Sequence, residues 1–374
     1  MTTISNEVFQ QLSFATSGGP MCPQLQHLTW TSACGYEHCQ LFLSPNLVSV
    51  VFWHSTNNFR LDLGLDSAIS PLPTTRLEKL CLTGYPPYTA PIHSALSEAV
   101  QRLNNCFKQI DVKSSLSDAA WGHLASLPKL ESLCVAGAPS IEVLKSIDLG
   151  HTFLALKRMT LELNGQHQHL AVLFSLFKSS SLEEVVVDES TEIQHVGVPA
   201  EVALAMLKAK LRTSVSTLAF DRFHPANVTF VSHLGPFSSL KALKCGTRCQ
   251  EHRQCGFPLM DADIERLASG LPQLVTLYLG HKCWYSHPST TIKSVMSLST
   301  HCPSLGSIHL PCNLTNISED VKMESGELDP RLKTRSSCAL EFLAFDWMTR
   351  TKDREASELM KSSVRHLFPR FRFT

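Results

Sequence analysis

Residues 115–137, SLSDAAWGHLASLPKLESLCVAG, contain a short apolar code that recurs along the chain. The code reads apolar-x-x-apolar-x-apolar and is formed by Leu130, Leu133 and Val135. Its last two positions lie on one side of a strand, because side chains of a strand alternate. A helical stripe precedes it, with Ser117 or Asp118 as the expected N-cap, and consists of Ala120, Trp121, Leu124 and Leu127. A unit this small cannot bury its apolar face alone, so it needs copies of itself on either side.

Copies of this code are found from one end of the chain to the other. Their first anchors are Leu25, Leu47, Leu77, Phe107, Leu130, Leu156, Leu182, Val215, Leu240, Leu274, Leu305 and Leu340. Successive first anchors lie between 22 and 35 residues apart. The mean of about 29 residues matches the longer, less regular form of the leucine-rich repeat.

The segments between the codes carry helical stripes. In DADIERLASGLPQL, apolar residues recur at i, i+3, i+4 and i+7 behind Asp261, which we expect to be the N-cap. Helix followed by strand, repeated with short links, favours a parallel sheet. The sequence therefore predicts an α/β leucine-rich-repeat solenoid of the ribonuclease-inhibitor-like type, a curved horseshoe with the sheet on its concave face and helices on its convex face.

The expected organisation has three parts. Residues 1–21 are an N-terminal lead-in, partly disordered, and residues 22–352 form the solenoid of about twelve irregular repeats. Within it, the polar segment 313–337 is expected to be a mobile insertion. Residues 353–374 are expected to form a capping helix and tail, since the open end of a repeat stack needs a cover.

Charge and cysteine content limit the classes of function. The 33 basic and 33 acidic residues cancel, and the strand faces carry no continuous Lys/Arg track, so binding to nucleic acid or to a membrane surface is not expected. The chain shows neither a secretory leader nor a membrane-spanning apolar run. The 13 cysteines then indicate buried free thiols in a reducing compartment, the cytoplasm, the nucleus or both.

One cysteine-rich segment could hold zinc. In KCGTRCQEHRQCG, the four candidate ligands are Cys245, Cys249, His252 and Cys255. Their spacing is not that of a common zinc finger, and Cys245 is also a strand anchor. Free thiols in and beside a loop are the favoured interpretation, so no metal and no cofactor is expected.

Polar and aromatic residues on the strands, and in the loops that leave them, are the candidate binding residues. They are His54, Tyr85, Arg158, Phe223, Tyr278, His281, Trp284, Tyr285, His309 and Trp347. Aromatic side chains at such a rim often anchor protein partners. The alternative is that most of these rings pack on the neighbouring repeat. No phosphate-binding loop, nucleophile elbow or zinc-protease motif is present, so no catalytic residue is assigned and the chain is not expected to be an enzyme.

Several phrases of the repeats resemble a known family. CPQLQHLTWTSACG, LSPNLVSVVF, LEKLCLTG, LSEAVQRLN and LPKLESLCVAG are similar to the leucine-rich-repeat region of mushroom-type (basidiomycete) fungal F-box proteins. The resemblance covers roughly residues 20–370. It implies a receptor whose repeats present a substrate protein to a cullin-based ubiquitin ligase, while an N-terminal F-box binds the ligase adaptor.

The N-terminal residues depart from that pattern. Residues 1–21 contain no LPxE-like opening followed by apolar helices, so the F-box is expected to be missing. Either the gene model is truncated, or this family member has lost ligase coupling. The first hypothesis is therefore a protein-binding module related to F-box substrate receptors, with an adaptor partner only if an F-box lies upstream. The alternative is a leucine-rich-repeat scaffold or regulator without a link to ubiquitin.

Overall fold

The fold is given by a computed structural model that describes residues 6–16, 19–31, 36, 38–53, 64–84, 90–146, 152–163, 169–175, 177, 181–189, 198–208, 211–221, 228–246, 259–280, 288–313 and 342–344. The chain divides into two compact units, Met1–Leu182 and Glu183–Thr374.

Strands and helices alternate in the first unit. Its elements are α1 (Asn6–Ala15), β1 (His27–Thr31), the 3₁₀ helix η2 (Cys39–Phe42), β2 (Ser49–Trp53), α2 (Leu65–Ile69), β3 (Lys79–Thr83), α3 (Ala90–Gln101), β4 (Gln109–Ser115), α4 (Asp118–Ser126), β5 (Ser132–Ala136), α5 (Ile141–Ser146), β6 (Arg158–Leu163) and α6 (Leu170–Ser175).

The second unit has the same alternation. Its elements are β7 (Glu184–Glu189), α7 (Val198–Lys208), the 3₁₀ helix η4 (Leu211–Thr213), β8 (Thr217–Asp221), α8 (Val228–Leu234), β9 (Ala242–Gly246), α9 (Asp261–Gly270), β10 (Thr276–Leu279), α10 (Ile292–His301), β11 (Ser307–His309) and β12 (Phe342–Ala344).

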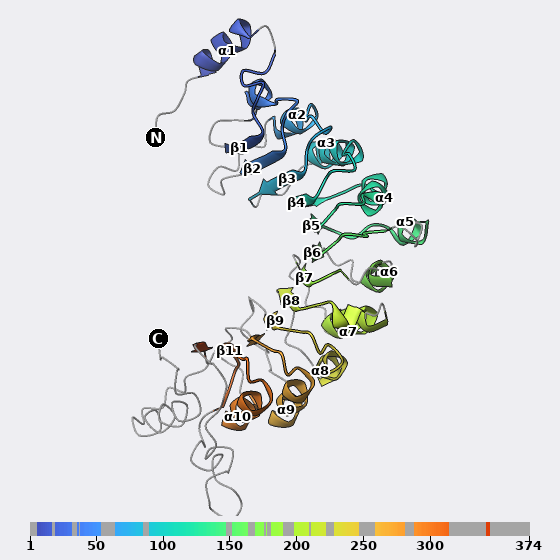
Figure 1. Ribbon diagram of the computed structural model, residues 1–374, viewed down its shortest axis with the longest axis vertical. Helices are drawn as coiled ribbons and strands as arrows, with labels where there is room; N and C mark the ends of the chain where they lie inside the picture. The colour runs from blue at the N-terminus through green and yellow to red at the C-terminus, as the bar shows by residue number, and fades with distance from the viewer. Residues whose placement is uncertain are drawn as a thin grey trace, which may run out of the picture. The chain divides into compact units, whose positions relative to one another are not determined.

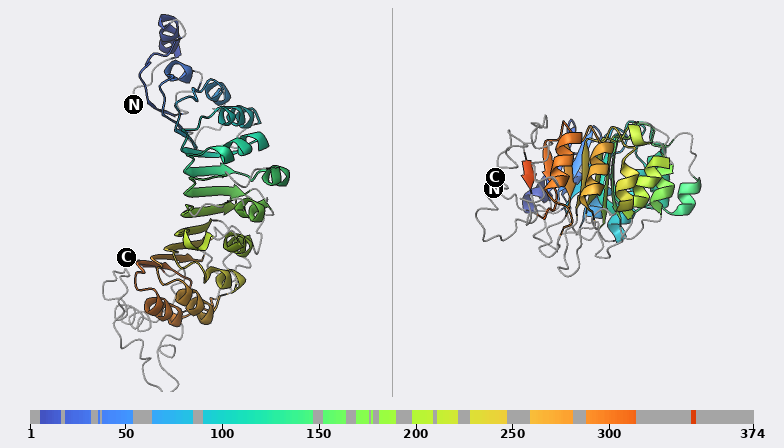
Figure 2. Two further views of the ribbon diagram at one scale, coloured as in Figure 1. Left: turned by 45° about the vertical axis from the view of Figure 1, so that its right-hand side comes forward. Right: turned by 90° about the horizontal axis from the view of Figure 1, so that it is seen from below.

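Within each unit the strands pair in sequence order and in parallel. Strands β1 to β6 follow one another in the first unit, and β7 to β12 do so in the second. The helices α2 to α6 lie along one face of their sheet, as α7 to α10 do in the second unit (Figures 1 and 2). The predicted α/β architecture, a parallel sheet whose strands alternate with helices in a repeat-like series, is confirmed.

The predicted code forms the core between the strands and the helices. Its three anchors are buried in every copy from the one at Leu47 to the one at Leu305, and Leu133 is 1% exposed. The anchor Leu25 is only half-buried, because its strand β1 ends the series. In β12, Leu343 lies in register with the buried Ile308, whereas the expected anchor Leu340 is outside the described residues.

A backbone hydrogen-bond pattern recurs just before the strands. The carbonyl of the residue that precedes a strand accepts two N–H groups from the next repeat. The carbonyl of Glu131, for example, accepts from the N–H groups of Lys157 at 2.9 Å and Arg158 at 3.0 Å. In the second unit, Lys241 accepts in the same way from Val275 and Thr276, at 2.7 and 2.9 Å. These paired bonds set a common register for the strand starts.

Side chains in the first helical turns also join one repeat to the next. Ser117 is the N-cap of α4, and its Oγ accepts from the N–H of Ala120 at 3.3 Å.

The prediction that Asp261 caps its own helix is wrong, because Met260 is the N-cap of α9. Asp261 instead accepts hydrogen bonds from the N–H groups of Thr291 (2.7 Å) and Ser294 (3.1 Å) at the start of α10. A carboxylate there meets unpaired N–H groups and the positive end of the helix dipole.

The N-terminal lead-in contains helix α1. Phe9 on this helix is buried, and its ring stacks on His38 with a centroid distance of 4.7 Å. The Phe9 ring also lies beside the Trp30 ring on β1, with a centroid distance of 6.3 Å. The predicted capping helix over 353–374 lies outside the described residues, and so does all of the predicted insertion 313–337 except Asn313.

Candidate functional site

One face of each sheet carries no described helix, and we call it the open face. Because strand side chains alternate, the residues between the buried anchors project from this face. In β2, Val50 and Phe52 point into the core, while Ser49, Val51 and Trp53 point outward. The strand register arranges the outward residues of successive strands in rows that cross the sheet.

The first row of the first unit consists of the residues that begin strands β1 to β6. We call it the donor row: His27, Ser49, Lys79, Gln109, Ser132 and Arg158. Each member can donate a hydrogen bond, and none carries a negative charge. All six residues are exposed or half-buried, and Arg158 is one of the exposed ones.

Asp111 lies in the second row between two thiols, one on each neighbouring strand. Cys81 Sγ donates to Asp111 Oδ2 at 3.5 Å, and Cys134 also hydrogen-bonds this carboxylate. Burial, followed by the charge of Asp111, raises the pKa of Cys81 to about 12. The same two causes raise the pKa of Cys134 well above its usual range. Both thiols therefore stay protonated near neutral pH, where they are hydrogen-bond donors and poor nucleophiles.

The two thiols are too far apart to form a disulfide. Cys81 and Cys134 occupy the same row on β3 and β5, with β4 between them. Two strand spacings separate their Cα atoms by about 10 Å, beyond the ~7 Å that a disulfide can span. The eight cysteines in the described part of the chain are free, and Cys22 and Cys106 are exposed rather than buried.

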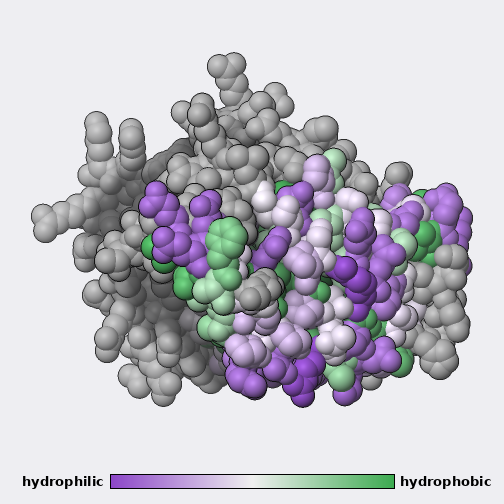
Figure 3. Space-filling model, turned by 90° about the horizontal axis from the view of Figure 1, so that it is seen from above, coloured by the Kyte–Doolittle hydropathy of each residue, from purple (hydrophilic) through white to green (hydrophobic). Residues whose placement is uncertain are grey.

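Trp53 is the large apolar side chain on the open face of the first unit. It ends β2 and is 56% exposed, between Thr31 on β1 and Thr83 on β3 in register. In the view of Figure 3, hydrophobic residues of the described surface occur in small groups among hydrophilic ones. An exposed indole beside hydroxyl groups is typical of a contact residue in a protein interface.

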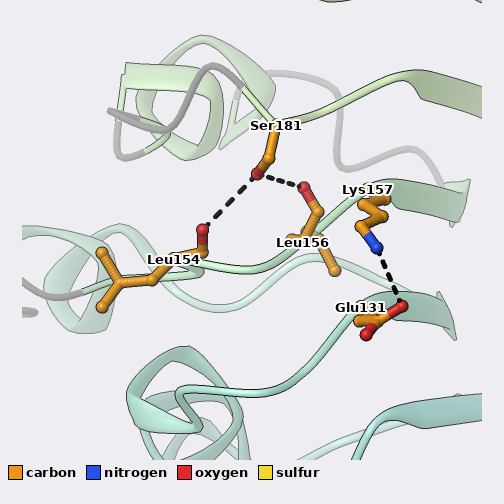
Figure 4. A network of polar contacts seen from close by, with 5 residues as sticks. All are labelled: Glu131, Leu154, Leu156, Lys157 and Ser181. Atoms are coloured by element: carbon orange, nitrogen blue, oxygen red, sulfur yellow. Dashed lines mark hydrogen bonds and ion pairs between the residues drawn. The ribbon is translucent and has the colours of Figure 1, made fainter.

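In the first unit, ion pairs link charged residues that lie just before the strands. Lys108 pairs with Glu78 at 2.8 Å, and Lys157 pairs with Glu131 at 3.2 Å. Figure 4 shows the second pair beside the hydrogen bonds from Ser181 Oγ to the carbonyl oxygens that precede β6. These ion pairs and hydrogen bonds join neighbouring repeats just before the strands, outside the rows of the open face.

An aromatic pair lies on the open face of the second unit. The rings of Tyr278 on β10 and His309 on β11 stack at 4.1 Å with an interplanar angle of 10°. A Cβ atom at Gly246 would lie 2.2 Å from Tyr278 Cε1, so the ring rests directly on the glycine backbone. Lys244 is exposed beside Tyr278, in register with it.

The structure places three of the predicted binding residues on open faces. Arg158 belongs to the donor row, while Tyr278 and His309 are half-buried and pack on each other across neighbouring strands. The remaining predicted positions lie outside the described residues: His54, Tyr85, Phe223, His281, Trp284, Tyr285 and Trp347.

The predicted zinc cluster is described only at its first position. Cys245 is fully buried and serves as a core anchor of β9, as its place in the code predicted. Cys249, His252 and Cys255 lie outside the described residues. Among the described residues, no three His, Cys, Asp or Glu side chains are grouped so that they could hold a metal ion.

Sequence reasoning missed the contact of Asp111 with Cys81 and Cys134. A signal was present, since each of the three residues lies midway between the last two anchors of its repeat code. None of the three residues indicates a site when it is considered by itself. Only the register of β3, β4 and β5 brings them together.

No protein-family model matches this sequence, and no curated protein matches it either. Within the described part of the chain, no helix combines the length and the apolar composition that a membrane crossing needs.

Proposed function

We propose that this chain is a leucine-rich-repeat protein that binds another protein through the open face of its sheet. The observation that carries the proposal is the contrast between the two faces of the first unit. One face is covered by α2 to α6, and the other presents the donor row together with the exposed Trp53. Concave or flat surfaces built from successive repeats suit the recognition of extended protein surfaces.

The leucine-rich-repeat assignment rests on the sequence code and its period. The code recurs about every 29 residues, within the range of this repeat class. The buried anchors and the recurring carbonyl hydrogen bonds before the strands support it. We further propose a role in substrate recognition related to that of F-box receptors, supported by the resemblance of the repeat phrases. A scaffold without a link to ubiquitin is the competing outcome of the test below.

The test is quantitative affinity capture of the full chain from its native cells. A double variant, Trp53→Ala with Thr29→Glu, alters the open face at two exposed positions. A matched control, Leu154→Ala with Ser126→Glu, makes the same kinds of change at exposed positions in turns and helix ends. We expect partners to be lost from the open-face variant and kept by the control.

Two readouts decide the two parts of the proposal. If both variants retain the same partners as the unchanged chain, the open face is not the contact surface. The presence of the ligase adaptor among the captured proteins supports the F-box relationship. Open-face-dependent partners without the adaptor support the scaffold instead.

A further inference from the structure

We infer that the open face of the first unit binds an acidic peptide segment, laid across the strands along the donor row. This inference rests on the proposed protein-binding function and specifies the chemistry of the partner. The row runs from His27 on β1 to Arg158 on β6 without an acidic side chain. Carboxylates are the groups that such a series of donors complements.

The two cations of the donor row are available to a partner. Neither Lys79 nor Arg158 forms an ion pair with a described residue. The lysines that precede the strands differ, because Lys108 and Lys157 are both paired with glutamates of neighbouring repeats. The donor row therefore presents two cations that form no ion pair within the described part of the chain.

The spacing of the cations suits an extended chain. Lys79 and Arg158 begin β3 and β6, so three strand spacings of ~4.8 Å place their Cα atoms about 14 Å apart. In an extended peptide, residues i and i+4 point to the same side and lie about 13 Å apart. Two acidic residues separated by three others can thus reach both cations, while Gln109 and Ser132 between them donate to the peptide.

Asp111 limits where the peptide can lie. Its carboxylate occupies the row next to the donor row, on the strand between Lys79 and Ser132. The thiols of Cys81 and Cys134, one on each neighbouring strand, hydrogen-bond this carboxylate. An acidic partner is repelled from the second row and kept on the first. A phosphate backbone, with a charge on every nucleotide, fits two cations beside a carboxylate poorly.

The experiment measures the binding of a fluorescein-labelled peptide to the full chain by anisotropy. The probe is a Gly/Ser peptide with two glutamates separated by three residues, and its partner probe has glutamine at both positions. We expect saturable binding of the glutamate probe alone, weakened when salt is raised from ~50 to ~500 mM because the contact is ionic.

Two charge-reversal variants test the location. The variant K79E/R158E alters the donor row, and the control K129E/K145E makes the same change of net charge at exposed positions away from the open face. We expect the donor-row variant to lose at least about tenfold in affinity and the control to change less than about twofold. The milder variant K79Q/R158Q should fall between them, and circular dichroism verifies that every variant is folded.

Three results would overturn the inference. Equal losses in the donor-row and control variants would show a general charge effect. Tighter binding of a single-stranded oligonucleotide, lost in K79E/R158E, would assign the row to nucleic acid. Failure of the unchanged chain to bind the glutamate probe, while the captured partners still depend on Trp53 and Thr29, would remove this inference and leave the proposed function standing.

Discussion

Substituting Leu133 by Asp should unfold the middle of the first unit. Leu133 is 1% exposed and lies in register between the fully buried Ile110 and Met159. Truncating a buried leucine costs about 2–5 kcal/mol, and an unpaired buried carboxylate adds several kcal/mol more. The expected loss of roughly 5 kcal/mol or more is comparable to the ~5–15 kcal/mol that holds a typical domain together.

The assay is urea unfolding followed by circular dichroism, with Glu131→Ala as the control. Glu131 is adjacent in the chain, but its side chain is 43% exposed and contacts Lys157 in a solvent-accessible ion pair. Loss of such a pair costs about 0–1 kcal/mol. The reasoning is refuted if both variants lower the unfolding midpoint equally, because Leu133 would then not belong to the core.

Three further predictions concern single contacts. Gly246→Ala should lower the free energy of unfolding in urea by about 1–3 kcal/mol, because the new Cβ would displace the ring of Tyr278. The control Gly122→Ala lies inside a helix with no atom near the new Cβ, and it should raise the free energy of unfolding by about 0.5–1 kcal/mol. Equal effects of the two substitutions would contradict the contact between Gly246 and Tyr278. Asp261→Ala should lower stability by about 1 kcal/mol, with Asp261→Asn closer to the unchanged chain, because α10 loses the acceptor for its first N–H groups. The Cys81 thiol should resist iodoacetamide at pH 8 in the folded protein, as mass spectrometry can measure. Because its pKa rises from 9.0 to about 12 on folding, its contribution to stability is complete below pH 9 and is lost as the pH rises from about 9 to about 12. A thiol that reacts as fast folded as unfolded would contradict the burial.

The helix and strand series could be predicted because it depends on local spacing. Trp121, Leu124 and Leu127 recur at helical spacing, and all three are buried as the stripe predicted. The cap was harder. Ser117 is the N-cap that the pattern indicated. The Asp261 carboxylate instead accepts from the first N–H groups of the next helix, α10, which lie thirty and more residues away in the sequence.

The candidate site could be predicted only in part. The alternation of side chains along β6 predicts that Arg158 points away from the core. It does not show that Lys157, its neighbour in the chain, is paired with Glu131 while Arg158 is unpaired among the described residues. That difference depends on which carboxylate the previous repeat places beside each cation.

The sequence by itself determined the repeat code, the α/β alternation and which residues are buried, because each depends on spacing within one repeat. Leu130, Leu133 and Val135 are buried, as their spacing in the code predicted. The tertiary structure alone decided which outward residues meet across the sheet. Asp111 contacts Cys81, thirty residues earlier, because parallel pairing places equivalent positions of neighbouring repeats side by side, and the spacing within one repeat does not show which side chains meet there.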